Sequence, residues 1–304
     1  MRHSLEILGR CSALALALVC SAVSAEAQHD ARFWRAIANN KYAVPEHESA
    51  DALARELSGL LASPDPELRD DLAYSILAHW IFRKNSPIST PTLLSLTDEW
   101  RANLKSGLGE SGTNSVLKRS FSALCLSAMA EREAQLPFMG AERYHQLVGE
   151  AVAYLTAERD LRGYDERLHW IHATAHTADL LGALARSSLL TKQESTSILA
   201  AMAARLSTAT GVYTQGEQDR LAAAVIEVIR RPDFDSSAFV PWLDGIKNED
   251  RDVWSATTIK SLARYQNHNY MLQALTVRLS LQPDSPRLEE YRKQVLGRLR
   301  ERLE

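Results

Sequence analysis

Apolar residues recur every three or four positions along most of the chain, which is the spacing of one buried face of an α-helix. No segment shows the strict alternation of apolar and polar residues that is typical of a half-buried strand. The pattern predicts helices over residues 48–63, 67–84, 90–105, 114–133, 143–158, 168–185, 197–206, 218–231, 236–246, 252–264, 269–281 and 287–303.

Several helix starts carry recognisable signals. Asp65 followed by Pro66 is typical of an N-cap with proline at the first helical position. Thr191 with Glu194 predicts a capping box, in which each side chain bonds the other residue's backbone amide. Thr214 with Glu217 has the same spacing and predicts a second box.

Many helices joined by short loops indicate an all-α fold of stacked helical pairs. We expect either a HEAT-like superhelix or a closed assembly resembling an α/α toroid, formed by a single domain over residues 28–304. Residues 286–304 form a charged last helix whose narrow apolar stripe consists of Leu288, Tyr291, Val295, Leu299 and Leu303. This stripe favours a solvated capping helix, with a partner-binding helix as the alternative.

The first 27 residues have the pattern of a secretory signal peptide. Arg2 and Arg10 precede a short apolar run at 13–23, and small residues at Ala25 and Ala27 offer two cleavage sites. The run is too short for a typical membrane-spanning helix. We therefore expect a periplasmic or secreted product that is not an integral membrane protein after cleavage.

Composition narrows the function classes further. The chain has 304 residues, 45% of them hydrophobic, and a net charge of −3. A sizeable core is therefore possible, and no basic excess is present to bind nucleic acid. Cleavage leaves Cys125 as the single cysteine, and its apolar neighbours predict a buried core residue.

The segment LHWIHATAHTADLLGALA, residues 168–185, is unusual because it contains histidines and an aspartate but no Lys, Arg or Glu. As one helix it would place His169, His172, His176 and Asp179 in a single polar stripe. A side of small residues that includes Gly182 would let another helix approach closely.

Buried polar groups need partners, so this stripe faces a metal, a polar cleft or a structural hydrogen-bond network. His172, His176 and Asp179 suit one divalent ion, zinc above all, with His169 as a further candidate ligand. Ala173 occupies the position of the glutamate in a HExxH metalloprotease motif, so no general base accompanies the histidines.

The same region resembles the DUF2785 family of uncharacterised proteins. The family pattern D-x-R-G-Y, a spacer, then W-x-H-x-x-x-H-x-x-D, matches Asp160, Arg162, Gly163, Tyr164, Trp170, His172, His176 and Asp179. KRSFSALCL at 118–126 and NEDRDVW at 248–254 also resemble family segments, so the resemblance spans about 65–280. Leu168 and His169 replace a frequent Lys-Gly pair, so the resemblance gives His169 no support as a ligand.

Five further residues are candidates for ligand binding: Arg162, Tyr164, Trp170, Glu249 and Arg251. Arg162 suits a carboxylate or phosphate, with a salt bridge to Asp160 as the alternative. Glu249, Asp250 and Arg251 could supply a further ligand or orient a histidine, and a solvated loop before the next helix is the alternative.

These residues predict a ligand site or divalent-metal site whose partner is a small molecule, a peptide or a glycan. The alternatives are a metal-dependent hydrolase and a non-catalytic scaffold that binds protein or glycan. Whether the protein is an enzyme stays open, because the sequence shows no nucleophile paired with a base.

Overall fold

The computed structural model describes residues 29–282 and 285–303, and these residues are almost entirely helical. The elements are α1 (Ala31–Asn39), α2 (Ala50–Leu60), the π-helix η1 (Glu67–Tyr74), α3 (Ser75–Phe82), α4 (Thr90–Asn103), α5 (Ser115–Gln135), α6 (Ala141–Ala157), β1 (Tyr164–Asp165), β2 (His169–Trp170), α7 (Ala173–Ala185), α8 (Lys192–Thr208), α9 (Glu217–Ile229), the 3₁₀-helix η2 (Ser236–Ala238), α10 (Phe239–Glu249), α11 (Ile259–Ser280) and α12 (Pro286–Leu303). The predicted all-α class is confirmed.

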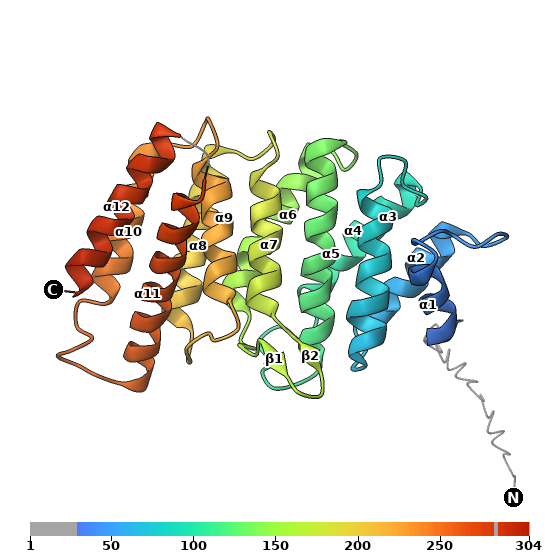
Figure 1. Ribbon diagram of the computed structural model, residues 1–304, viewed down its shortest axis with the longest axis horizontal. Helices are drawn as coiled ribbons and strands as arrows, with labels where there is room; N and C mark the ends of the chain where they lie inside the picture. The colour runs from blue at the N-terminus through green and yellow to red at the C-terminus, as the bar shows by residue number, and fades with distance from the viewer. Residues whose placement is uncertain (1–28, 283–284, 304) are drawn as a thin grey trace, which may run out of the picture.

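The helices stand side by side in chain order, from α1 at one end to α12 at the other (Figure 1). One layer contains α3, α5, α7, α9 and α11, in which α5, α7, α9 and α11 pack successively against each other. In the other layer α6 packs against α8 and α8 against α10, and α12 packs against both α11 and α10 at the end of the array. The array is open, because its first and last helices lie at opposite ends.

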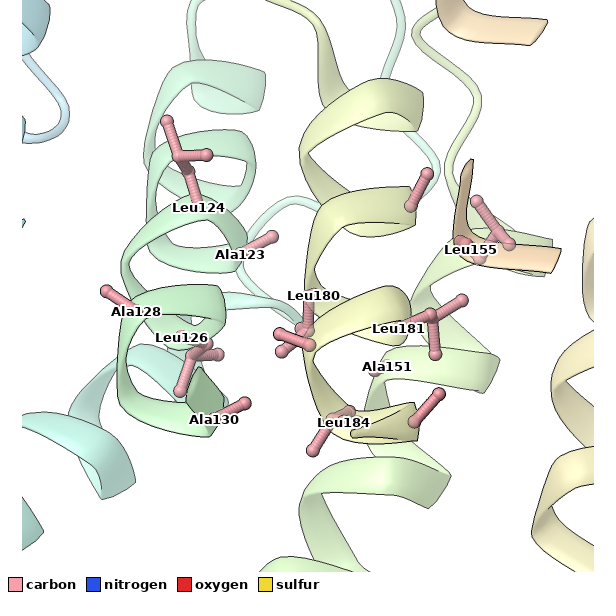
Figure 2. Packing of buried hydrophobic residues seen from close by; sticks show 14 of the residues in the cluster. Ala123, Leu124, Leu126, Ala128, Ala130, Ala151, Leu155, Leu180, Leu181 and Leu184 are labelled. Atoms are coloured by element: carbon pink, nitrogen blue, oxygen red, sulfur yellow. The ribbon is translucent and has the colours of Figure 1, made fainter. Parts of the chain in front are cut away.

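Small and branched side chains set the spacing at the centre of the array. Figure 2 shows Leu180 of α7 toward α5, and Leu181 close to Ala151 and Leu155 of α6. A Cβ atom on Gly182 would lie 3.4 Å from the Cα of Ala224 in α9. The small-residue side of α7 therefore does allow a close helix approach.

The helix starts were predicted with mixed success. Asp65 Oδ1 accepts the Glu67 amide at 3.0 Å, although the turn that follows is a π-helix. Thr191 and Glu194 form the predicted capping box. The second predicted box is wrong, because α9 begins after Gly216, whose φ of +91° fits glycine. The Glu217 side chain instead accepts the Gln215 amide.

The C-terminal region differs from the prediction in one helix boundary. The two helices predicted over 252–264 and 269–281 are a single helix, α11, which begins at Ile259. Residues before it form turns, and Thr258 with Ser261 makes a capping box that the sequence reading missed. In α12 the apolar stripe packs inward, with Leu288, Tyr291 and Val295 buried.

Cys125 is buried in the core as expected, and its burial raises the pKa of the thiol. No helix within 29–282 or 285–303 is both long and apolar enough to cross a membrane. The predicted signal peptide lies outside the described residues.

Candidate functional site

The histidine segment is divided between a hairpin and a helix. Strand β2 pairs antiparallel with β1, which sets Tyr164 opposite Trp170. Helix α7 then begins at Ala173 rather than at Leu168, so the predicted start of this helix is wrong. His169 consequently lies on the hairpin and not on the polar stripe of the helix.

Two backbone positions in this segment have unusual conformations. His169 and His172 adopt left-handed φ angles of 56° and 47°, which are uncommon for residues other than glycine. His172 is the residue at the N-cap of α7, and its side chain makes no capping bond. Its ring instead contacts Gln215 and Glu217 at the start of α9.

Arg69 of η1 binds the backbone of the hairpin. Its guanidinium donates to the carbonyl oxygens of Leu168 and Trp170 and lies 4.7 Å from the centre of the Phe121 ring. Arg69 is fully buried, and this burial lowers the pKa of its guanidinium. Arg69 is not recognisable from the sequence pattern, because the contact joins residues about a hundred positions apart.

The D-x-R part of the family pattern forms a clamp. Arg162 donates to both carboxylate oxygens of Asp160 and to the carbonyl of Thr113. Burial alone would raise the pKa of Asp160, but bonds from Arg162 and from the Gly112 amide hold it below its ordinary value. The salt-bridge alternative for Arg162 is therefore observed.

His172 is nearly buried, with 7% of its surface exposed. Its Nε2 lies 3.0 Å from the Gln215 carbonyl oxygen and 3.4 Å from Oε1 of Glu217. The ring stacks on Trp170 at a centroid distance of 4.6 Å. This histidine therefore joins the hairpin to the N-terminus of α9.

His176 lies one turn further along α7 and has a different set of partners. Ser120 Oγ donates to the Ile171 carbonyl, so it accepts the proton of His176 Nδ1, 2.8 Å away. Burial lowers the pKa of His176 far below its ordinary value, and the nearby His172 and Arg220 lower it further. The neutral ring then carries its lone pair on Nε2.

Asp179, the third predicted metal ligand, is bonded to Arg220. Arg220 Nε donates to Oδ1 at 2.6 Å, and Nη2 donates to Oδ2. Burial raises the pKa of Asp179, and the bonds from Arg220 oppose this shift without cancelling it. Both carboxylate oxygens are therefore occupied by a guanidinium.

The structure does not bring His172, His176 and Asp179 together around one point. Across 29–282 and 285–303, no group of three or more His, Cys, Asp or Glu side chains is placed to hold a metal ion. A zinc ion shared by these three residues stays a prediction, and it would require Asp179 to leave Arg220.

A pocket of about 260 Å³ opens on the surface where Asp179 lies, between α3, α5, α7 and α9. Two sets of ion pairs line it. Asp179 pairs with Arg220, and Arg186 bridges Glu131 at 2.6 Å and Glu227 at 3.3 Å. The remaining wall includes Tyr74, Phe82, Leu124, Ser127, Ala178, Gly182, Ala223 and Ala224.

Tyr164 and Trp170, two predicted ligand-binding residues, are exposed on the hairpin, at 45% and 39%. Their rings meet edge to face at 5.0 Å, and His169 stacks on Tyr164 at 5.6 Å. Neither residue lines the pocket at Asp179.

Glu249 and Arg251 lie at the end of α10, and the buried residue between them is Asp250. Arg251 bonds Asn248, whereas Asp250 bonds Arg264 and Arg302 and accepts His268 Nδ1 at 2.7 Å. An acidic residue of this segment therefore does orient a histidine, but that histidine is His268.

His268 Nε2 lies 3.2 Å from Ser207 Oγ, which completes a serine–histidine–aspartate sequence of contacts. The arrangement differs from a catalytic triad, because His268 is fully buried and Ser207 donates to its own helix at Ala203. We interpret this cluster as a connection between α8, α10, α11 and α12.

The comparisons with known proteins agree with the family resemblance. No curated protein and no solved structure matched the chain. The family model described as "Protein of unknown function (DUF2785)" matches residues 104–277, which include the clamp, the hairpin, α7 and α9. The match covers more than half of the sequence, so the chain belongs to the DUF2785 family.

Proposed function

We propose that this protein binds a small zwitterionic molecule, such as an amino acid or a short peptide, in the pocket beside Asp179. The observation that carries the proposal is the presence of arginine–carboxylate pairs on both sides of this pocket. Such pairs offer donors for a carboxylate and acceptors for an ammonium group within one cavity.

The arginines have hydrogen-bonding capacity beyond their ion pairs. Arg220 gives Nε and Nη2 to Asp179, which leaves the hydrogens of Nη1 for a ligand. The side chains of Arg186 and Arg220 are 46% and 41% exposed, so both are accessible from solvent. The carboxylate oxygens of Glu131, Asp179 and Glu227 each have a second lone pair beyond the one used in an ion pair, and these lone pairs can accept from an ammonium group.

Small residues keep this pocket open. Ala178 and Gly182 come from α7, and Ala223 and Ala224 come from α9. Of these four residues only Ala223 is partly exposed, so a larger side chain there would enter the space between the ion pairs. Partly buried charges are costly to desolvate, so their retention around a cavity favours a binding role over a packing role.

The test is a thermal-shift series with the chain from residue 28, using individual L-amino acids and glycylglycine. A ligand that binds the folded state raises the melting temperature by mass action. We expect at least one zwitterion to do so, and its N-acetyl amide, which lacks both charges, to have no effect.

Variants locate the binding site. Arg220→Gln removes a donor and Ala223→Leu fills the pocket, so both should abolish the shift. Arg278→Gln is the matched control, because Arg278 of α11 forms a similar ion pair with Asp219 of α9 and neither residue lines the pocket. Ala203→Leu in α8 controls for the added volume. A shift that survives Arg220→Gln and Ala223→Leu, or no shift with any zwitterion, contradicts the proposal.

Two further expectations from the sequence belong to this proposal. The helical pairs are taken to form a HEAT-like superhelix, and the protein is taken to act in the periplasm or outside the cell. The signal-peptide pattern supports the second point, and N-terminal sequencing of exported protein should begin at Glu26 or Gln28. The binding proposal assigns no reaction to the site.

A further inference from the structure

Glu217 contains a buried carboxylate oxygen without a hydrogen-bond donor. The residue is 1% exposed, and its Oε2 accepts the Gln215 amide at 3.0 Å. Among the residues that the structure describes, none forms a hydrogen bond with its Oε1. An unsatisfied buried carboxylate is expensive, so a further group is needed at this oxygen.

Two other electron-pair donors converge on the same point. His172 Nε2 lies 3.4 Å from Glu217 Oε1 and 3.0 Å from the Gln215 carbonyl oxygen. The side-chain oxygen of Gln215 is also close, since a Cβ built on Gly163 would lie 2.6 Å from it and 2.5 Å from Glu217 Oε1. Nitrogen and oxygen atoms of His172, Gln215 and Glu217 therefore lie close together beside Gly163.

Zinc bonds of about 2.0–2.2 Å in tetrahedral geometry place neighbouring ligand atoms roughly 3.3–3.6 Å apart. The 3.4 Å between His172 Nε2 and Glu217 Oε1 lies in this range, whereas the 3.0 Å between Nε2 and the Gln215 carbonyl oxygen would have to widen by a few tenths of an ångström when a metal binds. We propose that His172 Nε2, Glu217 Oε1 and the Gln215 carbonyl oxygen bind a divalent transition-metal ion, zinc being the best match to the imidazole.

This site differs from the one predicted by the polar stripe. It keeps His172 but replaces His176 and Asp179 by groups at the start of α9. It has two ligating side chains and a main-chain carbonyl, so it is compatible with the lack of three-side-chain groups in the described residues.

A bound metal ion would give a partner to both His172 Nε2 and Glu217 Oε1. The Nε2 proton of His172 moves to Nδ1, so the neutral ring gives its Nε2 lone pair to the ion. The cation supplies the positive partner that Glu217 Oε1 needs. The left-handed backbone at His172 aims the ring at α9, and backbone conformations of this kind are concentrated at functional sites.

Zinc stoichiometry is the first test. Untagged protein is stripped with a chelator, given excess ZnCl₂, dialysed and measured by elemental analysis. We expect one zinc per chain for wild type, and loss of that zinc in His172→Gln and Glu217→Gln. We also expect a higher melting temperature for the zinc-loaded wild type.

Three controls separate this site from other histidines. His176→Gln and Asp179→Asn should retain zinc, whereas the stripe predicted from the sequence requires that they lose it. His145→Gln should also retain zinc, because His145 belongs to a partly exposed pair with Glu194. Zinc lost equally from His176→Gln, or no zinc on wild type, overturns the proposal.

A second measurement does not depend on whether the variants fold. X-ray absorption of the zinc-loaded wild type should show one imidazole among oxygen ligands, and two or more imidazoles overturn the assignment.

In the stripped protein, Glu217→Gln should not lower the melting temperature, because it removes an unsatisfied charge. A marked decrease shows instead that protonated His172 already neutralises Glu217, and this outcome also overturns the proposal.

Discussion

Gly163 and Glu217 lie so close together that a Cβ at position 163 would be 2.5 Å from Oε1 of Glu217 and 2.8 Å from Cβ of Gln215, so both neighbours would have to shift. The glycine of the family pattern is therefore required for the approach of the hairpin segment to α9. We expect Gly163→Ala to lower the free energy of unfolding by about 1–3 kcal/mol, the usual cost of overpacking. Urea denaturation measures this change.

Gly149 in α6 is the matched control, because a Cβ there would have no neighbour within 4 Å. Gly149→Ala should be neutral or stabilise the protein by up to about 1 kcal/mol, since alanine favours a helix. Equal effects of the two substitutions would show that the contact with Glu217 is unimportant.

The ion pair between Arg119 and Glu158 is buried, with side chains 0% and 3% exposed. Arg119→Met would leave an uncompensated buried carboxylate and should cost about 3–5 kcal/mol of unfolding free energy. Arg143, which pairs with Asp98 at the surface, is the comparison. Arg143→Met should cost less than about 1 kcal/mol, and chemical denaturation of both variants checks the contrast.

His176 should make the fold sensitive to acid. Its pKa in the folded state lies well below the ordinary value, chiefly because the ring is buried. As the pH falls below about 6.5, the unfolded state gains a proton that the folded state does not accept, so stability decreases. Above this pH both states are neutral there and the effect disappears.

Comparison of denaturation midpoints at about pH 7.5 and about pH 5.5 tests this sign. His176→Gln should lose less stability than wild type on acidification, even if it is less stable at neutral pH. A steeper loss in the variant would contradict the assignment of a neutral, buried His176.

Substitution of Asp250 should lower the free energy of unfolding much more than substitution of Ser207. Asp250→Ala removes the shared partner of His268, Arg264 and Arg302, so it should cost about 3–5 kcal/mol. Ser207→Ala removes one partly exposed hydroxyl bonded within its own helix, and should cost less than about 1 kcal/mol. A large effect of Ser207→Ala on a measured activity, with the fold intact, would argue for a catalytic role.

The sequence predicted helices well where periodicity and caps agreed. The boundaries failed where long-range contacts decide the backbone. Arg69 binds the carbonyls of Leu168 and Trp170, and these bonds hold a hairpin where the local pattern favours helix. Long-range contacts also act where a helix was predicted to begin at residue 252. The structure has turns there, and the neighbouring Asp250 forms ion pairs with Arg264 of α11 and Arg302 of α12.

The burial of the candidate site residues could be predicted, but their partners could not. His172 and His176 are nearly buried, as the apolar surroundings of their segment predict, and Asp179 is partly buried. Their partners Ser120, Gln215, Glu217 and Arg220 come from α5, α9 and the segment before α9. Helical spacing reports which side chains share a face, but it carries no information about what the neighbouring helices present to that face.

The order of the helices in the array determines which helices should unfold first. Helix α7 has neighbours on both sides in its own layer and contacts α6 in the other, whereas α1 and α12 are terminal. Partial unfolding should therefore proceed inward from the two ends, as in linear repeat arrays. Amide hydrogens of α7 should exchange most slowly with deuterated solvent, so the segment carrying the histidines would be the last to lose its structure.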